Sequence, residues 1–343
     1  MPSQRFLIVR LGSMGDIVHT LPAAAVLADS FPGAPIDWLV DRKWSALLDG
    51  NPDLNEVIPI DTRKLADILA IGGRLRVAGY TAALDFQSLY KSALLARLSG
   101  AKQIFGFDWK YSRESAASLL YTAKIHPQGT HKIDHNLDLA RAAGATNAAL
   151  ATPRFNFPIS AEADEWVAAE LKKHSLDKFL VISAGGGWRS KCWPAERYGQ
   201  LHAEIARRTG LRAILNFGPG EEGLVTQLIQ AAGDPAPIPL QMSIPQLIAL
   251  LRHAQLIIAA DTGPLHLAAA LGTPALALFG PTDPARNGPW SSMPARTRVI
   301  RHAEPGETTY KRGDSYSRAM LRIPVPEVTS AAIEMLEPSL EHR

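Results

Sequence analysis

The chain has very little cysteine: Cys192 is the only one among its 343 residues. A single cysteine excludes an intrachain disulfide, and it excludes the paired-cysteine patterns of zinc fingers and iron–sulfur proteins. A lone thiol fits a reducing compartment, and we expect a cytoplasmic protein.

Long hydrophobic runs are also missing. The most apolar part of the chain is interrupted by His266, Gly272 and Pro274, so it falls short of the roughly 20 apolar residues that a membrane-spanning helix needs. The first residues carry no long apolar stretch before Arg10, which is unlike a secretory leader. We therefore expect any membrane contact to be peripheral.

The chain also lacks a marked charge of one sign. It has 36 basic and 33 acidic residues and a formal net charge of +3, which is too weak a balance to indicate a nucleic-acid partner. The glycine loop after the first predicted strand, Gly12–Asp16, is neither a Gly-x-Gly-x-x-Gly dinucleotide fingerprint nor a Gly-Lys-Ser/Thr phosphate loop, which argues against a nicotinamide enzyme or a P-loop protein.

What the chain does have is a repeated alternation of short β-branched runs with helical patterns. With 46% apolar residues over this length, we predict two α/β domains, each with a mostly parallel, doubly wound sheet. This alternation is interrupted at the proline-containing segment 151–158, which we interpret as a linker. The predicted domains are residues 1–155 and 156–343. In tandem they would form a cleft at the carboxyl ends of their strands, where ligands bind such folds.

The most informative motif is the turn Asp261–His266. It follows the apolar run 256–260 and precedes the small-residue segment 267–271, an order that indicates a strand, a tight turn and a helix. Such a turn directs backbone N–H groups and the helix dipole at one point, which favours an anion. We predict that it binds a phosphorylated ligand.

A second glycine loop, Gly12–Asp16, follows the first predicted strand, 6–9. Asp16 has two interpretations that do not exclude one another. It can be the N-cap of the helix predicted for 16–28, the commoner role of an aspartate at this place. It can also be a general base at the mouth of the cleft.

A third loop follows the predicted strand 179–183. Its three consecutive glycines, Gly185 to Gly187, allow a ligand to approach the backbone closely. Arg189 and Lys191 add positive charge suited to a diphosphate. Cys192 lies beside them without a local histidine partner, so we predict no role for it.

Several weaker signals lie on the same predicted side of the two sheets. The turns 218–222 and 280–284 close further strands and can be only turns. In the first half Arg63, Lys64, Lys91 and Arg113 occupy loops or helix starts, where they would suit an acidic acceptor if they face one cleft. His131 and His135 are four residues apart, but no carboxylate pattern completes a metal site, and we predict none.

These motifs together carry a family resemblance. The segment Ile8–Pro22 resembles the opening of the ADP-heptose:lipopolysaccharide heptosyltransferases (glycosyltransferase family nine), especially the type I enzymes that act on inner-core Kdo. The turns 261–266 and 280–284 resemble the donor-site signature of that family, and the segments 85–92 and 107–114 match its acceptor half. The motifs occur in the right order over nearly the whole chain.

The resemblance implies a GT-B fold of two Rossmann-like domains, with a last helix, about 325–338, that packs back on the first domain. It implies an inverting, metal-independent transfer without a cofactor, from ADP-heptose to the Kdo of a lipid A precursor. It also implies a monomer with transient contact to the cytoplasmic face of the inner membrane. By the same resemblance Asp16 is the general base. The implied donor-binding residues are Ser183, Gly187, Lys191, Asp261, Thr262, Gly263 and His266, and the acceptor-binding residues are Ser13, Gly15, Arg63, Lys64, Lys91 and Arg113.

Two alternatives stay open at this point. One is a transferase of the same fold that uses another nucleotide sugar or a non-Kdo acceptor, because the motifs define the reaction type better than the sugar. The other is a non-catalytic nucleotide-sugar-binding protein, against which the combination of Asp16 and Lys191 argues. No role is predicted for the loop 305–322.

Overall fold

The fold was analysed in a computed structural model that describes residues 4–151, 154–290 and 293–340. The chain divides into two compact units, Met1–Pro158 and Ile159–Arg343. The predicted boundary lies three residues earlier, and part of the predicted linker, 152–153, lies outside the described residues. The segment that follows stays with the first unit because Asn156 accepts a hydrogen bond from Asn51 (2.7 Å) and donates one to Asp53 (2.7 Å).

The first unit is built on a six-stranded parallel sheet with the order β3-β2-β1-β4-β5-β6. Its strands are β1 (Phe6–Val9), β2 (Ile36–Asp41), β3 (Glu56–Ile60), β4 (Ala82–Asp85), β5 (Gln103–Phe107) and β6 (Ala123–Ile125). Ile8 in the central strand pairs with Trp38 on one side and Leu84 on the other. This is the doubly wound arrangement, whose switch point lies between β1 and β4.

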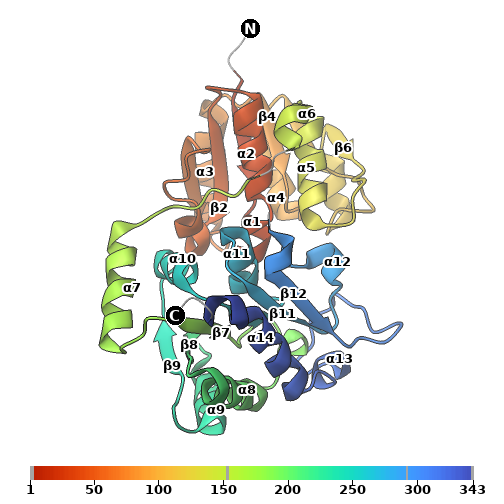
Figure 1. The fold of residues 1–343 in the computed structure, drawn as a ribbon. Helices are drawn as coiled ribbons and strands as arrows, with labels where there is room; N and C mark the ends of the chain where they lie inside the picture. The colour runs from red at the N-terminus through yellow and green to blue at the C-terminus, as the bar shows by residue number, and fades with distance from the viewer. Residues whose placement is uncertain (1–3, 152–153, 291–292, 341–343) are drawn as a thin grey trace. The chain divides into compact units, whose positions relative to one another are not determined.

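Helices cover both faces of this sheet (Figure 1). They are α1 (Met14–Val18), α2 (Leu21–Ser30), α3 (Leu65–Val77), α4 (Tyr90–Leu98), α5 (Lys132–Ala142) and α6 (Asn147–Leu150), with 3₁₀ turns η1 (Arg42–Leu47) and η2 (Ser115–Leu120). Helix α2 packs with α5, whereas α4 packs with α3 and η2. The strands between these layers are apolar on both sides, and β1 and β4 are buried throughout.

The second unit repeats the architecture with the order β12-β11-β10-β7-β8-β9. Its strands are β7 (Phe179–Ser183), β8 (Arg212–Phe217), β9 (Ile238–Gln241), β10 (Ile257–Ala260), β11 (Ala275–Phe279) and β12 (Thr297–Arg301). The helices are α7 (Ala161–Lys173), α8 (Ala195–Thr209), α9 (Glu222–Ala232), α10 (Ile244–His253), α11 (Gly263–Leu271), α12 (Pro284–Asn287), α13 (Arg318–Leu321) and α14 (Val325–Leu340), with 3₁₀ turns η3 (Arg189–Lys191) and η4 (Pro294–Arg296). The switch point here lies between β7 and β10.

The helix predicted for residues 16–28 is wrong as a single element. The structure has two helices, α1 and α2, with Thr20 as the N-cap of the second and Pro22 in its first turn. Proline has no backbone N–H, so it cannot continue the hydrogen bonding of a preceding helix, but it fits the first turn of a new one.

The last helix, α14, contributes its buried side chains to the core of the second unit. Val328, Ala331, Ala332 and Leu336 lie in one apolar cluster with residues of that unit, and α14 packs against α8. The expected packing of this helix against the first domain stays a prediction. Val328, Ala331, Ala332 and Leu336 are buried together because they lie on one face of the helix.

None of the described helices is long and apolar enough to cross a membrane.

Candidate active site

Asp16 lies in the short helix α1, directly after the loop that follows β1. Its carboxylate accepts hydrogen bonds from the backbone N–H of Ser13 (3.1 Å) and from the Ser13 hydroxyl (2.9 Å). The other carboxylate oxygen lies 2.5 Å from Nη2 of Arg10. Ser13, not Asp16, is therefore the N-cap of α1. The N-cap lies three positions before Asp16, so the N-cap interpretation of Asp16 is wrong. Asp16 instead completes the capping box, because its carboxylate accepts the hydrogen bond of the Ser13 backbone N–H.

The surroundings of Asp16 keep it ionised. Its side chain is 32% exposed. Burial acts to raise the pKa of its carboxyl, but the nearby Arg10 charge, the two Ser13 hydrogen bonds and His19 outweigh this and lower the pKa to about 2. The residue is thus a charged carboxylate at neutral pH that can accept a proton, although its ion pair with Arg10 makes it a weak base.

Arg10 is held in place by the loop after β4. Its Nη1 donates a hydrogen bond to the carbonyl of Phe86, and the neighbouring Leu11 N–H donates to Gln87 (2.6 Å). That loop is itself fastened by the buried Asp85, which accepts hydrogen bonds from Ser92 (2.8 Å) and Tyr121 (2.7 Å). The switch point between β1 and β4 thus fixes the position of Asp16 through Arg10.

Three of the four expected acceptor-site cations, Arg63, Lys64 and Lys91, lie around the segment that follows β3. Lys91, in the first turn of α4, donates to the Thr62 carbonyl (3.3 Å) beside Arg63 and Lys64. Arg113 is exposed in the loop after β5, where its neighbour Glu114 accepts from the Tyr90 N–H (2.7 Å) at the start of α4. Ser13 and Gly15 lie in the Asp16 loop itself. All of these residues follow carboxyl ends of strands in the first sheet.

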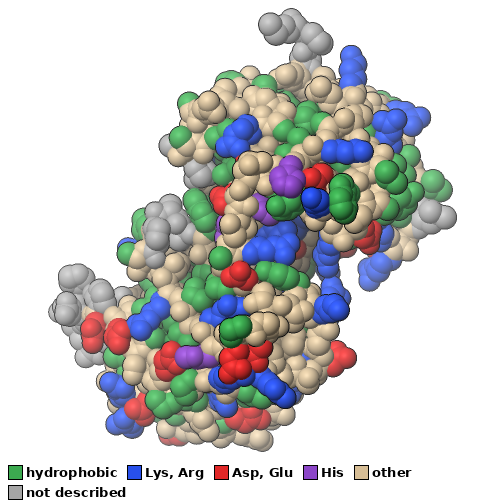
Figure 2. Space-filling view, turned by 90° about the vertical axis from the view of Figure 1, so that its right-hand side faces the viewer, with side chains coloured by type: hydrophobic (Ala, Val, Ile, Leu, Met, Phe, Trp, Pro, Cys, Tyr) green, Lys and Arg blue, Asp and Glu red, His purple; other side chains and the backbone are tan. Residues whose placement is uncertain are grey.

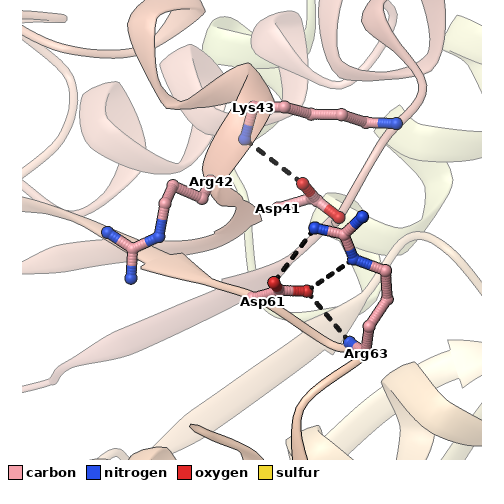
Figure 3. A pocket seen from close by; sticks show the side chains of 5 residues that line it. All are labelled: Asp41, Arg42, Lys43, Asp61 and Arg63. Atoms are coloured by element: carbon pink, nitrogen blue, oxygen red, sulfur yellow. Dashed lines mark hydrogen bonds and ion pairs between the residues drawn. The ribbon is translucent and has the colours of Figure 1, made fainter.

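Arg63 is less available than the sequence suggests. Its guanidinium donates to the Asp61 side chain at 2.9 and 3.0 Å, so part of its charge is neutralised locally. The two residues line a hollow of about 300 Å³ with Asp41, Arg42 and Lys43 (Figure 3). Arg42 and Lys43 are cations at this edge that the sequence analysis missed. Their place directly after the strand predicted for 36–40 was the available signal.

In the second unit the loop after β7 carries the glycines and Lys191. A Cβ atom on Gly185 would lie 1.8 Å from the Glu221 carboxylate, and one on Gly186 would lie 2.8 Å from the Cys192 sulfur, so a side chain at either position would have to displace its neighbour. Gly187 is exposed with open space around it. Ser183, the last residue of β7, is buried and accepts from Asn216 (3.2 Å).

Asp261 is the centre of a buried polar network. Its carboxylate lies 2.5 Å from the Lys191 ammonium and 3.0 Å from Nε2 of His266. It also accepts a hydrogen bond from the Thr282 hydroxyl (2.8 Å). Burial acts to raise the pKa of Asp261, but His266 and Lys191 outweigh it and hold the pKa well below its usual range. The network joins the loops that follow β7, β10 and β11.

The turn after β10 has the geometry predicted for an anion site. Thr262 is the N-cap of α11, which begins at Gly263 and runs for nine residues. The Thr262 hydroxyl is buried and has no hydrogen-bond partner among the described residues. An unpartnered hydroxyl beside a helix N-terminus and a buried ammonium group suits a phosphate oxygen.

Thr282 is a third residue that the sequence analysis missed. It belongs to the 280–284 turn, and two signals of its role were available: the position of that turn at a strand end and its resemblance to the donor-site signature of the family. Cys192 is buried, and burial raises the pKa of its thiol, so it is an unreactive neighbour as expected.

His131 and His135 do not form a metal site. His131 accepts from the Ile133 N–H (3.2 Å) and His135 bonds the Gly129 carbonyl (2.9 Å). Across residues 4–151, 154–290 and 293–340, no group of three or more metal-binding side chains is assembled.

Solved structures with the same fold define the class. The chain covers 99% of E. coli heptosyltransferase WaaC with ADP-2-deoxy-2-fluoro heptose, over 96% of its own length, with a TM-score of 0.73 and 27% identity. The protein is a glycosyltransferase with the GT-B fold of two Rossmann-like units.

Sequence comparison defines the family. Residues 68–318 match the model of glycosyltransferase family 9 (heptosyltransferase), and the chain belongs to this family. It is 30% identical to lipopolysaccharide heptosyltransferase 1 of Escherichia coli K12 over 300 residues, 83% of this chain and 90% of that one. It is 28% identical to lipopolysaccharide heptosyltransferase 3 of the same strain over 298 residues, 81% of this chain and 83% of that one.

Proposed function

We propose that this enzyme transfers L-glycero-D-manno-heptose from ADP-heptose to the Kdo of a lipid A precursor, with inversion at the anomeric carbon and without a metal ion. The observation that carries the proposal is the pair of polar centres at strand ends of the two sheets. One is an ionised carboxylate, Asp16, and the other is the network of Lys191 and Asp261 beside the α11 N-terminus.

In this proposal the second unit binds the donor. The diphosphate lies against Lys191, the Thr262 hydroxyl and the N–H groups at Gly263, with Gly187 giving the backbone room to approach. Ser183 and Asp261 line the same strand ends, and His266 keeps Asp261 in place (3.0 Å). The Lys191 ammonium group and the N–H dipoles of the α11 N-terminus favour a nucleoside diphosphate and its release as an anion.

The transfer is a single displacement in which atoms and charge balance. The acceptor hydroxyl oxygen forms a bond to the anomeric carbon as the bond from that carbon to the ADP oxygen breaks. Asp16 receives the hydroxyl proton. The electron pair leaves with ADP, whose new negative charge Lys191 and the α11 N-terminus stabilise in place of a metal ion.

The first unit binds the acceptor in this proposal. Ser13 and Gly15 border Asp16, while Arg63, Lys64, Lys91 and Arg113 supply positive charge for the Kdo carboxylate and the lipid A phosphates. Because this acceptor lies in a membrane, the enzyme acts at the cytoplasmic face of the inner membrane in this proposal. We propose a peripheral monomer with no nucleic-acid partner.

The decisive experiment measures ADP release with ADP-heptose and a Kdo-containing acceptor, and compares Asp16→Asn with the wild type. We expect kcat to fall by roughly 10²- to 10⁴-fold, with donor affinity, measured by calorimetry, within about twofold of the wild type. Full activity of Asp16→Asn would show that another group is the base. A panel of ADP- and UDP-sugars separates this proposal from use of another donor.

A lipopolysaccharide acceptor other than Kdo is a second candidate. The similarity to heptosyltransferase 3 as well as to heptosyltransferase 1 favours it. Transfer to a heptosylated acceptor but not to a Kdo-terminated one would support this candidate over the first.

A further inference from the structure

An exposed apolar surface lies beside the expected acceptor cations in the first unit. We define it as the apolar ridge, made of Tyr90 and Leu94 on α4, Trp109 and Tyr111 after β5, and Leu119 on η2. Trp109 is 63% exposed, Tyr90 52% and Leu119 78%. Large side chains exposed to this degree are unremarkable singly, but a contiguous group of them marks an interaction surface.

The three segments of the ridge are neighbours. Helix α4 packs against η2, and Glu114 joins the loop after β5 to the start of α4, because its carboxylate accepts from the Tyr90 N–H (2.7 Å) and its own N–H donates to the Ser88 carbonyl (3.0 Å). Tyr90 and Leu94 are four residues apart on one helix and therefore share a face. The other large exposed hydrophobic side chains described in this unit, Leu69 and Val77, lie on α3.

The charge around the ridge is mainly positive. Exposed cations flank the apolar side chains on α4 and in the loop after β5, namely Lys91, Arg97, Lys110 and Arg113. Lys110 lies over the Trp109 ring, 5.6 Å from its centroid. The two nearby acids are engaged locally, since Glu114 binds the Tyr90 N–H and Asp108 pairs with His126 (2.7 Å).

The chemistry of this surface fits an anionic lipid bilayer. Trp and Tyr prefer the level of the lipid headgroups, and exposed Leu side chains reach the acyl boundary. Lys and Arg bind anionic headgroups while their alkyl chains lie along apolar surface. Figure 2 shows a face of the first unit on which hydrophobic and basic side chains lie side by side.

We propose that the apolar ridge is the surface through which this enzyme contacts the membrane that holds its lipid acceptor. The inference rests on the proposed function, because only a lipid-anchored acceptor calls for such contact. Tyr90 and Trp109 follow the carboxyl ends of β4 and β5, the edge of the sheet at which Asp16 follows β1. Contact here brings a headgroup sugar of the bilayer toward the base.

The first test measures binding to vesicles of phosphatidylethanolamine with about 30% phosphatidylglycerol by sedimentation. The double variant Leu94→Ser/Leu119→Ser removes apolar surface from the ridge without touching a residue assigned to the reaction. We expect its binding to fall at least fivefold. The matched control is Val77→Ser, which removes an 89% exposed side chain at the end of α3, the opposite edge of the same sheet, and should bind as the wild type does.

The second test measures depth with brominated acyl chains, which quench only tryptophans near the bilayer. We expect quenching of the wild type and a clear loss of quenching in Trp109→Phe. Equal quenching of the two proteins, or equal vesicle binding of the wild type and the double variant, would overturn the proposal. A concentration-dependent dimer that the double variant abolishes would assign the ridge to a second copy of the chain instead.

The third test separates this inference from the proposed function. With a deacylated, water-soluble acceptor the double variant should match the wild type, whereas with acylated acceptor in vesicles its kcat/KM should fall at least fivefold. Equal losses with both acceptors would place the ridge in acceptor binding and overturn membrane contact. If the wild type itself transfers to neither acceptor, the proposed function fails, while the vesicle measurements still decide the membrane contact.

Discussion

Nη2 of Arg10 lies 2.5 Å from Oδ1 of Asp16, so the carboxylate proposed as the base is held in an ion pair. The pair stabilises the charged form and makes Asp16 a weak base in the resting enzyme. The pKa of Asp16 therefore depends on Arg10 and not on the acceptor alone.

The first prediction concerns the pH dependence of activity. Since the pKa of Asp16 is about 2, the wild-type kcat/KM should show no acid limb from Asp16 above about pH 4. Arg10→Gln removes the opposing charge, so the pKa rises and an acid limb should enter the range of pH 4–6. Arg10→Lys keeps the charge and serves as the control. Identical pH profiles for Arg10→Gln and the wild type would separate Arg10 from the function of the base.

The same pair predicts a stability effect of defined sign. The folded-state pKa of Asp16 is lower than the ordinary aspartate value of 3.8, so the carboxylate stabilises the folded state above about pH 4 and loses this contribution as the pH falls through about 2. Urea unfolding of Asp16→Asn should therefore show a weaker fall in stability between pH 4 and pH 2 than the wild type. A fall in the variant as steep as that of the wild type, or steeper, would contradict the assigned direction.

Another prediction concerns Lys191 and Asp261. Asp261→Asn leaves the buried Lys191 ammonium without its counter-charge, and we expect a loss of about 3 kcal/mol in the free energy of unfolding. Lys191→Met in the same chain should recover part of that loss, because no buried charge then stays unpaired. Thermal unfolding of the two single variants and the double variant gives the coupling. Additive effects would mean that the 2.5 Å pair is not coupled in solution.

Lys191→Met also tests donor binding. A charge-assisted contact with the diphosphate contributes about 1.5–3 kcal/mol, which corresponds to a roughly 10- to 100-fold weaker affinity for ADP by calorimetry. Arg189→Met is the matched control, since Arg189 lies in the same turn with its guanidinium over the Tyr316 ring, 4.4 Å from the centroid. A comparable loss in both variants would indicate a general charge effect.

Thr282 provides a further prediction. Its hydroxyl supports Asp261 from the loop after β11 (2.8 Å), so Thr282→Val should destabilise the fold by about 1–2 kcal/mol and raise the KM for the donor several-fold with little change in kcat. Thr282→Ser keeps the hydroxyl and should restore the donor KM. Failure of the serine variant to do so would point to packing of the lost methyl group and not to the hydrogen bond.

The metal-independent mechanism predicts that EDTA leaves the rate unchanged. Lys191 and the α11 N-terminus would then stabilise the leaving ADP, so the Lys191→Met variant should become sensitive to added Mg²⁺ while the wild type stays insensitive. Loss of wild-type activity in EDTA that Mg²⁺ restores would overturn the metal-free proposal.

The sequence determined the fold class, because apolar β-branched strands, glycine-containing turns and helical patterns are local signals. The strands β1 and β7 have the bounds that these patterns predict, 6–9 and 179–183. Some short elements were not predicted from the sequence. Strand β6 has three residues, too few to show a period, and the proline at position 22 divided a helix that apolar spacing alone made continuous.

The sequence motifs identified residues that could carry chemistry, Asp16, Lys191 and Asp261 among them. Residue types and positions after predicted strands can be read directly from the sequence. Only the tertiary structure decided their partners. Arg10 meets Asp16 because the loop after β4 holds the guanidinium, and Thr282 meets Asp261 because β10 and β11 are adjacent in the sheet. Hydrogen bonds between residues distant in sequence depend on which strands pair, and strand pairing is settled by the packing of the whole unit.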